Sequence, residues 1–479
     1  MDLVCGLDVG TSGAKVLVVD AHGGVVARAG SRFTKPPYVP APGFAEQDAD
    51  QWWEASRDCL KQIPDRVKDR IAAIAVDSTS GTFVPVGRQG EPLLPAFMYN
   101  DGRAGGLEEE VRRAAGGLSE RLGYAFPAAF SLVKIVWLLK ERPDIVKATH
   151  KFLHAADFLV GRLTGDFDCT DTSNALKSGV DLISGAWPKF LEKELGLPLS
   201  KFPKVFKPGE RLGEVSASAS RETGLRTGTP VIAGASDGMA SFLASGAKSV
   251  GDWNLNLGTT LAIRGISDRL VRDPRGRLYC HRHPEGYWLP GGASNVGGEG
   301  LVLKFGDSRL SELDGVSPDF LPTTLIVYPL ARKGERMPFV SSKAEGFVIG
   351  DAGSEGELYA GYLEGIALIT AWSIEEAGAI GAEVDGEYFL SGGGGRGKTL
   401  GRVIASGLRK MLLKTGEPEA AMGSALLAGA WAWFGGRVSA AQKQMVQREE
   451  MFEPIPEMID PLRDKLEALK KECQKRGYF

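Results

Sequence analysis

Residues 6–13 (GLDVGTSG) combine glycine, hydroxyl and carboxylate side chains between two β-type runs, residues 3–7 and 14–19. Successive N–H groups of a glycine-rich turn form a concave anion site, and a neighbouring carboxylate can hold hydrated Mg²⁺. We therefore predict that Asp8 organises the metal ion and that a phosphate loop is formed by Gly10, Thr11, Ser12 and Gly13. A hairpin whose turn merely requires glycine has the same pattern and remains an alternative.

A second loop of this kind, Gly258-Thr259-Thr260, lies between a β-type run at residues 253–257 and another that resumes at residue 261. Two Gly-Thr loops in two similar halves could bind the β- and γ-phosphates of a nucleotide from both sides of a cleft. A glycine cluster at residues 392–395 follows a further apolar strand, and its Gly393 and Gly394 would let the backbone lie against a nucleotide. A tight turn explains that cluster equally well.

Asp237 stands in the segment 233–238 (AGASDG), where a short strand opens onto a predicted helix. A carboxylate at this place could accept the proton of a sugar hydroxyl while that oxygen attacks the γ-phosphorus of ATP. Asp is also a preferred helix N-cap. The phosphate loops elsewhere in the chain favour the interpretation of Asp237 as a general base.

The elements that must position these residues alternate between strands and helices, which predicts an α/β fold. A length of 479 residues exceeds what one core usually supports, so we expect two domains, residues 1–248 and 249–479. Helical periodicity predicts helices within residues 107–142 and 147–163, and Trp52 and Trp53 are expected in the core.

The composition indicates a small-molecule partner. The formal net charge of −3 argues against nucleic acid, and no apolar run reaches the roughly 20 residues that a membrane span needs. The five cysteines are scattered and show no zinc spacing, which fits a cytoplasmic protein. The histidines receive no role, and His281 and His283 are expected in a surface loop.

In their order along the chain these segments resemble the FGGY family of carbohydrate kinases, members of the actin, Hsp70 and hexokinase superfamily. GLDVGTSGAK is similar to the family's first phosphate loop, GASDGMAS to its catalytic-base segment, LNLGTTLAI to its second phosphate loop and LSGGGGRGKT to its adenosine segment. The resemblance implies two RNase-H-like α/β domains with a cleft between them. It also implies ATP and Mg²⁺ as cofactors, a sugar-binding N-terminal domain that carries the base, and a nucleotide-binding C-terminal domain.

Within the family, the chain is most similar to the D-ribulokinase (xylulose-kinase-like) group of cyanobacteria and plants. Segments that carry this similarity include IAVDSTSGT (74–82), SNALKSG (173–179) and GERMPF (334–339). The similarity implies sugar contacts from Asp8, Ser12, Ser80 and Asp237, and nucleotide contacts from Thr11, Gly258, Thr259, Gly393 and Gly394. Gly397 departs from the group, which tends to have Asn there.

The expected reaction is ATP + D-ribulose → ADP + D-ribulose 5-phosphate, with domain closure expelling water. Thr79 and Ser80 replace a Met-His pair of typical D-xylulose kinases, which counts against xylulose, whereas residues 45–48 (AEQD) are similar to xylulose kinases. A kinase for D-xylulose or another polyol is the alternative. A non-kinase ATPase or a sugar-responsive regulator is the alternative of a different class. A monomer or a homodimer is expected.

Overall fold

The computed structural model describes residues 2–393 and 397–479. The described chain forms two compact units. Unit 1 comprises the residues up to Ala244, with His281–Gly286 and Glu419–Gln447; unit 2 comprises Ser245–Cys280, Tyr287–Pro418 and Arg448–Phe479. The chain first passes from one unit to the other at residues 244 and 245, close to the predicted boundary, and then returns to unit 1 twice.

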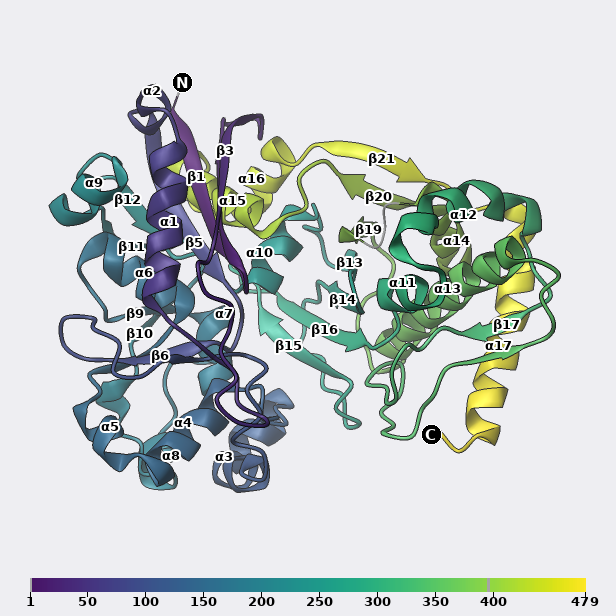
Figure 1. The fold of residues 1–479 in the computed structure, drawn as a ribbon, viewed down its shortest axis with the longest axis horizontal. Helices are drawn as coiled ribbons and strands as arrows, with labels where there is room; N and C mark the ends of the chain where they lie inside the picture. Colours follow the sequence, from purple (N-terminus) through teal and green to yellow (C-terminus); the bar gives the residue numbers. More distant parts are fainter. Residues whose placement is uncertain (1, 394–396) are drawn as a thin grey trace. The chain divides into compact units, whose positions relative to one another are not determined.

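Unit 1 is built on a six-stranded sheet with the order β11-β12-β5-β1-β2-β3 (Figure 1). The strands are β1 (Leu3–Val9), β2 (Gly13–Val19), β3 (Val25–Arg32), β5 (Ile71–Ser78), β11 (Arg211–Glu214) and β12 (Pro230–Ile232). β1, β2 and β3 form an antiparallel meander, whereas β5 lies parallel to β1 and to β12. The predicted strands around the first glycine turn are thus confirmed.

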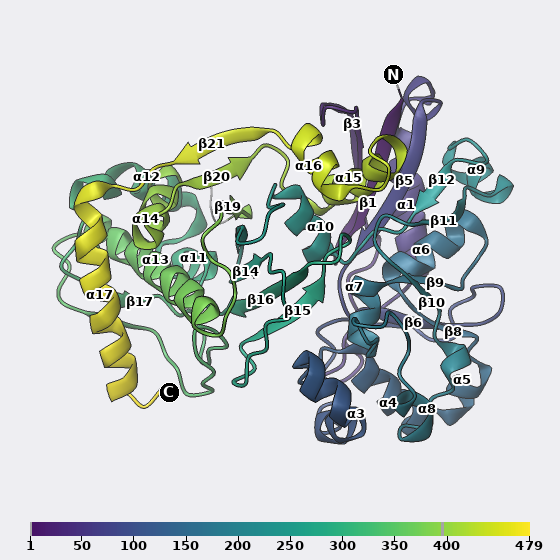
Figure 2. The ribbon, with the colours of Figure 1, turned by 180° about the vertical axis from the view of Figure 1, so that it is seen from behind.

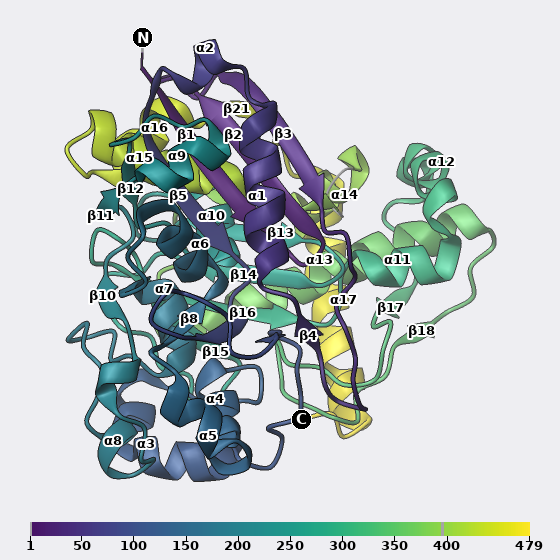
Figure 3. The ribbon, with the colours of Figure 1, turned by 60° about the vertical axis from the view of Figure 1, so that its left-hand side comes forward.

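The two faces of this sheet are covered by different parts of the sequence. Helices α1 (Asp50–Gln62) and α6 (Ala155–Thr164) pack on one face (Figure 3). The alternate residues Leu3, Cys5 and Leu7 of β1 belong to the core on this face. Trp52 and Trp53 of α1 are 1% and 6% exposed, which confirms their predicted place in the core.

The opposite face packs against α10 (Asp237–Ala244) and α15 (Ala420–Trp433), which comes from the last quarter of the chain. The approach of α15 is unusually close, because a Cβ added to Gly6 would stand 1.8 Å from the carbonyl oxygen of Ala421. A Cβ on Gly423 would likewise stand 1.9 Å from the carbonyl oxygen of Ala240. Glycine at these two positions lets α15 reach both β1 and α10.

The rest of unit 1 surrounds a four-stranded sheet with the order β4-β7-β6-β8. Its strands are β4 (Glu46–Gln47), β6 (Phe83–Val86), β7 (Ala96–Phe97) and β8 (Lys151–His154). The helices of this part include α3 (Glu108–Leu122), α4 (Ser131–Glu141), α5 (Pro143–Ala148) and α7 (Thr172–Ala175). The prediction of a helix over residues 147–163 is wrong for residues 151–154, because their pairing with β6, Val84 opposite Leu153, outweighs the local periodicity.

Unit 2 repeats the strand arrangement of unit 1 in a seven-stranded sheet with the order β15-β16-β14-β13-β19-β20-β21 (Figure 2). The strands are β13 (Trp253–Leu257), β14 (Leu261–Gly265), β15 (Leu278–Arg282), β16 (Trp288–Ser294), β19 (Tyr388–Ser391), β20 (Leu412–Thr415) and β21 (Arg448–Phe452). β13, β14 and β16 are antiparallel neighbours, and β19 lies parallel to β13 and β20. The predicted α/β class is confirmed in both units.

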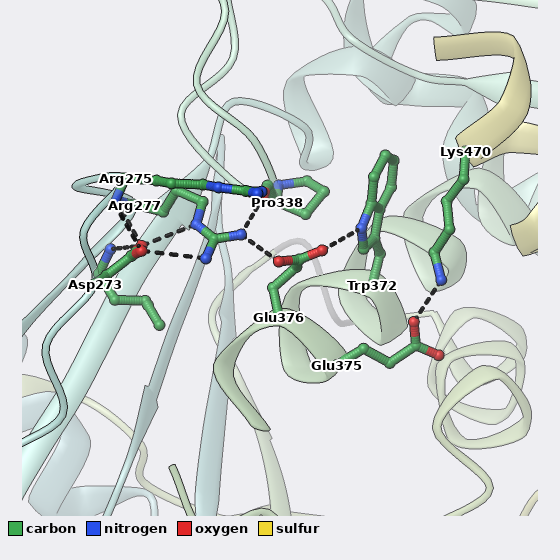
Figure 4. Close-up of polar contacts among 9 residues, drawn as sticks. Asp273, Arg275, Arg277, Pro338, Trp372, Glu375, Glu376 and Lys470 are labelled. Atoms are coloured by element: carbon green, nitrogen blue, oxygen red, sulfur yellow. Dashed lines mark hydrogen bonds and ion pairs between the residues drawn. The ribbon is translucent and has the colours of Figure 1, made fainter. Parts of the chain in front are cut away.

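The helices α13 (Glu355–Ala379), α14 (Lys398–Leu408) and α17 (Pro456–Lys475) pack against one another in unit 2. A buried ion-pair network fixes the loop before β15 to α13 (Figure 4). The Arg277 guanidinium donates to Asp273 Oδ2 at 2.9 Å, to the carbonyl oxygen of Pro338 at 3.2 Å and to Glu376. Trp372 Nε1 donates to the same Glu376 carboxylate, at 3.1 Å. Each buried charge of the network therefore has an opposite charge beside it.

His281 and His283 are 2% and 1% exposed, so their predicted place in a surface loop is wrong. They belong to the short segment 281–286, which packs into unit 1 after the chain has left it, a long-range contact that local composition does not reveal. No helix in the described part of the chain has the length and hydropathy of a membrane span.

Candidate functional site

Three aspartates gather at the carboxyl ends of the parallel strands of unit 1. Asp8 at the end of β1 lies directly opposite Asp77 on β5, and the pair Ser78 and Ser236 forms a parallel bridge one step further. Asp237 follows Ser236 and begins α10. Because the carboxyl ends of parallel strands lie at one edge of a sheet, the topology itself brings the three carboxyl groups together.

The protonation of these acids is set mainly by burial. Burial raises the pKa of Asp77, which is 0% exposed, well above its usual value, and the charges of Asp8 and Asp237 raise it further. Burial also raises the pKa of Asp8, whereas its hydrogen bond with Asp77 and the nearby Lys15 ammonium lower it. As a carboxylate, Asp77 would leave its buried Oδ1 without a donor. We conclude that Asp77 is the protonated member of the pair and donates a hydrogen bond to Asp8.

Ser424 on α15 completes the surroundings of Asp77. Its hydroxyl donates to Asp77 Oδ2 at 2.6 Å, and both side chains are fully buried. This contact is available because the small residues of α15 let its backbone approach β1 and α10. Asp77 and Ser424 were both missed by the sequence reasoning.

Asp237, the predicted base, is half-buried at the start of α10. Its Oδ1 accepts the N–H of Gly238 at 2.7 Å. The N–H groups of Met239 and Ala240, which a capping side chain would accept, both donate to the carbonyl oxygen of Ser236 at 2.9 Å. The carbonyl oxygen of Ser236 thus serves two N–H groups of the first turn of α10.

The backbone before Asp237 is fixed by a buried hydrogen-bond chain. The Ser236 N–H donates to Ser173 Oγ at 2.8 Å, and this hydroxyl donates to Asp171 Oδ1 at 2.5 Å. The Asp171 carboxylate also accepts the backbone N–H groups of Ser173 and Asn174. The backbone that carries Asp237 is thus held in place, which is what a group that transfers a proton requires.

Ser80 lies in the turn that follows β5. Thr79 and Thr82 close this turn with a hydrogen bond of 3.0 Å between their hydroxyl groups. The Ser80 hydroxyl oxygen is buried and has no hydrogen-bond partner among the described residues. A buried hydroxyl without a partner is costly for a protein alone and is suited to a polar ligand.

The first predicted phosphate loop is a tight turn, in which the Gly10 N–H donates to the Gly13 carbonyl oxygen at 3.0 Å. Thr11 and Ser12 are exposed at its tip. Their carbonyl oxygens are held from behind by the Gln47 side chain at 3.1 Å and the Phe33 N–H at 3.0 Å. The turn is rigid and presents hydroxyl groups to solvent; its role in phosphate binding stays a prediction.

The second predicted phosphate loop borders a cavity of about 820 Å³ in unit 2. Gly258 and Thr259 line it together with Gly393, so three predicted nucleotide residues share one cavity; Gly394 lies outside the described residues. The volume is in the range of ordinary ligand pockets. Sequence reasoning missed the rest of the lining, which includes Leu301, Val302, Leu303, Asp314, Tyr359 and Lys398.

Lining residues 298–303 belong to α11 (Gly298–Phe305), whose start is joined to the second loop. The Gly298 N–H donates to the Gly258 carbonyl oxygen at 2.9 Å, and the Glu299 N–H donates to that of Thr259 at 3.2 Å. Apolar side chains of α11 thus form a wall beside a glycine backbone. A flat aromatic base above a polar phosphate end fits such a mixture of surfaces.

Asp8 is the predicted metal-binding residue. In the described chain, no three His, Cys, Asp or Glu side chains form a group that could hold a metal ion alone. Magnesium in phosphoryl-transfer sites is commonly held by one or two carboxylates together with water and the phosphates themselves. The half-buried carboxylate of Asp8, beside a neutral Asp77, fits that single-carboxylate role.

Comparisons with known proteins show to which proteins the chain is similar. The chain is 31% identical to the xylulose kinase of Streptomyces rubiginosus over 293 residues, 60% of this chain and 59% of that relative. It is 26% identical to the gluconokinase of Bacillus subtilis over 307 residues, 63% of this chain and 58% of that relative. Both matches thus span less than two thirds of the relative's length.

The crystal structure of xylulose kinase from Rhodospirillum rubrum matches with a TM-score of 0.87 and 26% identity, covering 99% of this chain and 98% of that one. The family models for carbohydrate kinases match almost the whole chain: the N-terminal FGGY domain at residues 3–244 and the C-terminal FGGY domain at residues 246–433. The chain belongs to the FGGY family of carbohydrate kinases.

Proposed function

We propose that the protein transfers the γ-phosphoryl group of ATP to a ketopentose, and that D-ribulose is its main substrate. The observation that carries the proposal is the group of Asp8, Asp77 and Asp237 at one strand edge of unit 1. Phosphoryl transfer to an alcohol needs one carboxylate to accept a proton and another to organise the phosphate charge. The three aspartates offer both within one short stretch of sheet edge.

Asp237 accepts the proton of the C5 hydroxyl while that oxygen attacks the γ-phosphorus and ADP leaves. The hydrogen-bond chain through Ser236 and Ser173 keeps its backbone in place. Asp77 keeps its own proton, so it adds no charge to the site and orients the Asp8 carboxylate through their hydrogen bond. Asp8 and Asp237 are left as the two carboxyl groups available for chemistry.

Asp8 would hold Mg²⁺ through water, and the ion when bound supplies positive charge to the phosphates. The hydroxyls of Thr11, Ser12 and Thr259 provide donors for phosphate oxygens, and Gly10, Gly13 and Gly258 form the two turns that carry them. The apolar wall of α11 in the unit 2 cavity would cover the adenine. Gly393 borders the same cavity and supports a nucleotide there.

The choice of D-ribulose rests on Ser80 and on the resemblance of residues 74–82 to the D-ribulokinase group. The buried Ser80 hydroxyl lacks a partner, so a sugar hydroxyl placed beside it would gain a hydrogen bond. D-xylulose is the second candidate, because the relative from Streptomyces rubiginosus and the solved structure from Rhodospirillum rubrum are named xylulose kinases. The two ketopentoses differ only in the configuration of one hydroxyl-bearing carbon.

A coupled assay of ADP release tests the proposal over D-ribulose, D-xylulose, L-ribulose, gluconate, ribitol and glycerol, with a blank that contains no sugar. We expect the largest kcat/KM for D-ribulose and a product phosphorylated at the C5 hydroxyl, identified by ³¹P NMR. The Asp237→Asn variant should lack this activity, while Asp69→Asn, at an exposed position of the same unit, should keep it.

Two outcomes would contradict the proposal in different ways. A much larger kcat/KM for D-xylulose would replace the substrate and leave the reaction unchanged. ADP release that does not depend on any added sugar would indicate an ATPase on this fold.

A further inference from the structure

Lys134 is a lysine in the interior of unit 1. It lies in the first half of α4, among apolar residues, and its side chain is 0% exposed. Lysine is almost never fully buried without a specific partner, because an ammonium group loses its hydration there. The contacts of Lys134 must therefore account for its position.

The Lys134 ammonium group binds two backbone carbonyl oxygens from two different turns. Nζ donates to the Gly81 carbonyl oxygen at 3.0 Å and to the Met98 carbonyl oxygen at 2.7 Å. Within the described chain, Lys134 forms no ion pair shorter than 4 Å. The carboxylate that attracts it, Asp101, is bound by Arg103 at 2.7 Å.

The two hydrogen bonds of Lys134 do not require its positive charge. Burial lowers its pKa to about 7, against the opposing attraction of Asp101, while Lys177 and Arg103 lower it further. Two carbonyl acceptors require two N–H bonds, and a lysine amine has at least two in either protonation state. A methionine would fill the same space without loss of hydration, so the lysine contributes the connection between the turns.

The two turns that Lys134 connects surround Ser80. Gly81 follows Ser80 directly and adopts φ +87°, a conformation that favours glycine. The second turn is tied to the first by the Tyr99 N–H, which donates to Thr82 Oγ1 at 3.1 Å. The strands beside the two turns also pair, Phe83 opposite Phe97, but Lys134 is the side chain that binds the carbonyl oxygens of both turns.

We propose that Lys134 is a positioning residue for sugar recognition: it holds the Ser80–Gly81 turn and the Met98–Tyr99 turn together, so that the Ser80 hydroxyl meets the substrate. The inference rests on the proposed function, because it requires that Ser80 contacts the sugar. Lys134 itself touches no substrate. Its effect reaches the sugar only through the backbone of the two turns.

The test compares the wild type with Lys134→Met and Lys134→Gln in the full-length enzyme, with Lys140→Met as the control on the exposed side of the same helix. We expect Lys134→Met to raise the KM for the best sugar by about fivefold, the scale of one lost hydrogen bond, and to leave the KM for ATP within about twofold. Lys134→Gln keeps a donor on a shorter side chain and should give an intermediate KM. Lys140→Met should resemble the wild type.

Two further measurements separate positioning from general stability. Hydrogen exchange of the sugar-free enzyme should become faster at residues 79–82 and 98–101 in Lys134→Met and stay unchanged in α1 and α15. Ser80→Ala should raise the sugar KM in the wild-type background and much less in the Lys134→Met background, because the hydroxyl is already misplaced there.

The results that would overturn this inference differ from those that would overturn the proposed function. A normal Ser80→Ala effect together with an unchanged sugar KM in Lys134→Met and Lys134→Gln would overturn this inference alone. Equal increases of the KM for sugar and for ATP would show a general structural role and would also overturn it. If Ser80→Ala alone leaves the sugar KM unchanged, the sugar contact proposed for Ser80 is overturned, and this inference with it.

Discussion

Asp77→Asn is the substitution that most directly tests the protonation of the site. A neutral Asp77 donates a hydrogen bond to Asp8 and accepts the Ser424 hydroxyl at Oδ2. Asparagine reproduces both contacts, because its amide N–H replaces the acid proton and its carbonyl oxygen accepts the Ser424 hydroxyl. The variant should therefore fold and should be at least as stable as the wild type near pH 7.

The size of the expected stability difference between Asp77→Asn and the wild type follows from the pH dependence of stability. The folded-state pKa of Asp77 is raised, whereas an unfolded Asp titrates near about 3.9. Above that pH the unfolded chain loses the proton that the folded protein keeps, so the wild type loses stability as pH rises, until the pH passes the folded pKa. One proton corresponds to about 1.4 kcal/mol per pH unit. Asp77→Asn removes this loss.

Thermal melting of wild type, Asp77→Asn and the exposed control Asp69→Asn between pH 5 and pH 8 measures the effect. The melting temperature of Asp77→Asn relative to wild type should rise with pH, by up to about 3–5 °C per pH unit if unit 1 melts cooperatively. Asp69→Asn should follow the wild type at every pH. Parallel curves for Asp77→Asn and wild type would mean that Asp77 is ionised in the folded protein, and the assigned proton would have to be abandoned.

Four other variants test the remaining parts. Asp237→Asn should lower kcat by about 100-fold or more while calorimetry still detects sugar and ATP binding; near-normal turnover would refute the role of base. Asp8→Asn should abolish activity even at saturating Mg²⁺, and a normal kcat there would leave Asp8 as a turn residue only. Ser173→Ala should lower the free energy of unfolding by about 1–3 kcal/mol in urea titrations, since the Ser236 N–H loses its buried partner. The variant should also lower kcat more than it changes the sugar KM. An unaltered kcat would show that catalysis does not need the hydrogen bond between Ser173 and Ser236. Arg277→Met should lower the melting temperature of unit 2 by leaving Asp273 and Glu376 unpaired, a loss of about 3–5 kcal/mol; an unchanged melting temperature would show that the network adds no stability.

The sequence predicted those site residues whose chemical role and secondary-structure element can both be recognised within one short segment. Asp8 ends a run of alternating apolar residues before a glycine turn, and Asp237 stands between a strand and a helix, so both could be identified from local pattern. The same holds for Gly258 and Thr259, which now border the unit 2 cavity. Local pattern was sufficient because strand ends and glycine turns are local features.

The missed residues act through contacts between distant segments. Ser424 meets Asp77 across 347 positions of sequence, and this contact depends on the close packing of α15 on β1. The apolar wall of the cavity comes from α11, whose leucines look like ordinary core residues until the cavity is seen. Local periodicity predicts helix for β8, because the pairing of this strand with β6 is a tertiary effect. The hydrophobic periodicity of a single segment does not indicate such contacts.

The carboxyl groups of the site receive different roles from their surroundings, although all three are aspartates. Asp77 is enclosed by the sheet and by α15, so it holds a proton and serves as a hydrogen-bond donor. Asp8 lies opposite it, less buried and with the Lys15 ammonium near enough to favour its charge, which suits a residue that organises a cation. Asp237 stands on a separate element whose backbone is held by Ser173 rather than by the other acids. Separate environments of this kind are how one site keeps one acid neutral and another available as a base at the same pH. The sheet brings the three groups together, and the helices α10 and α15 make them different.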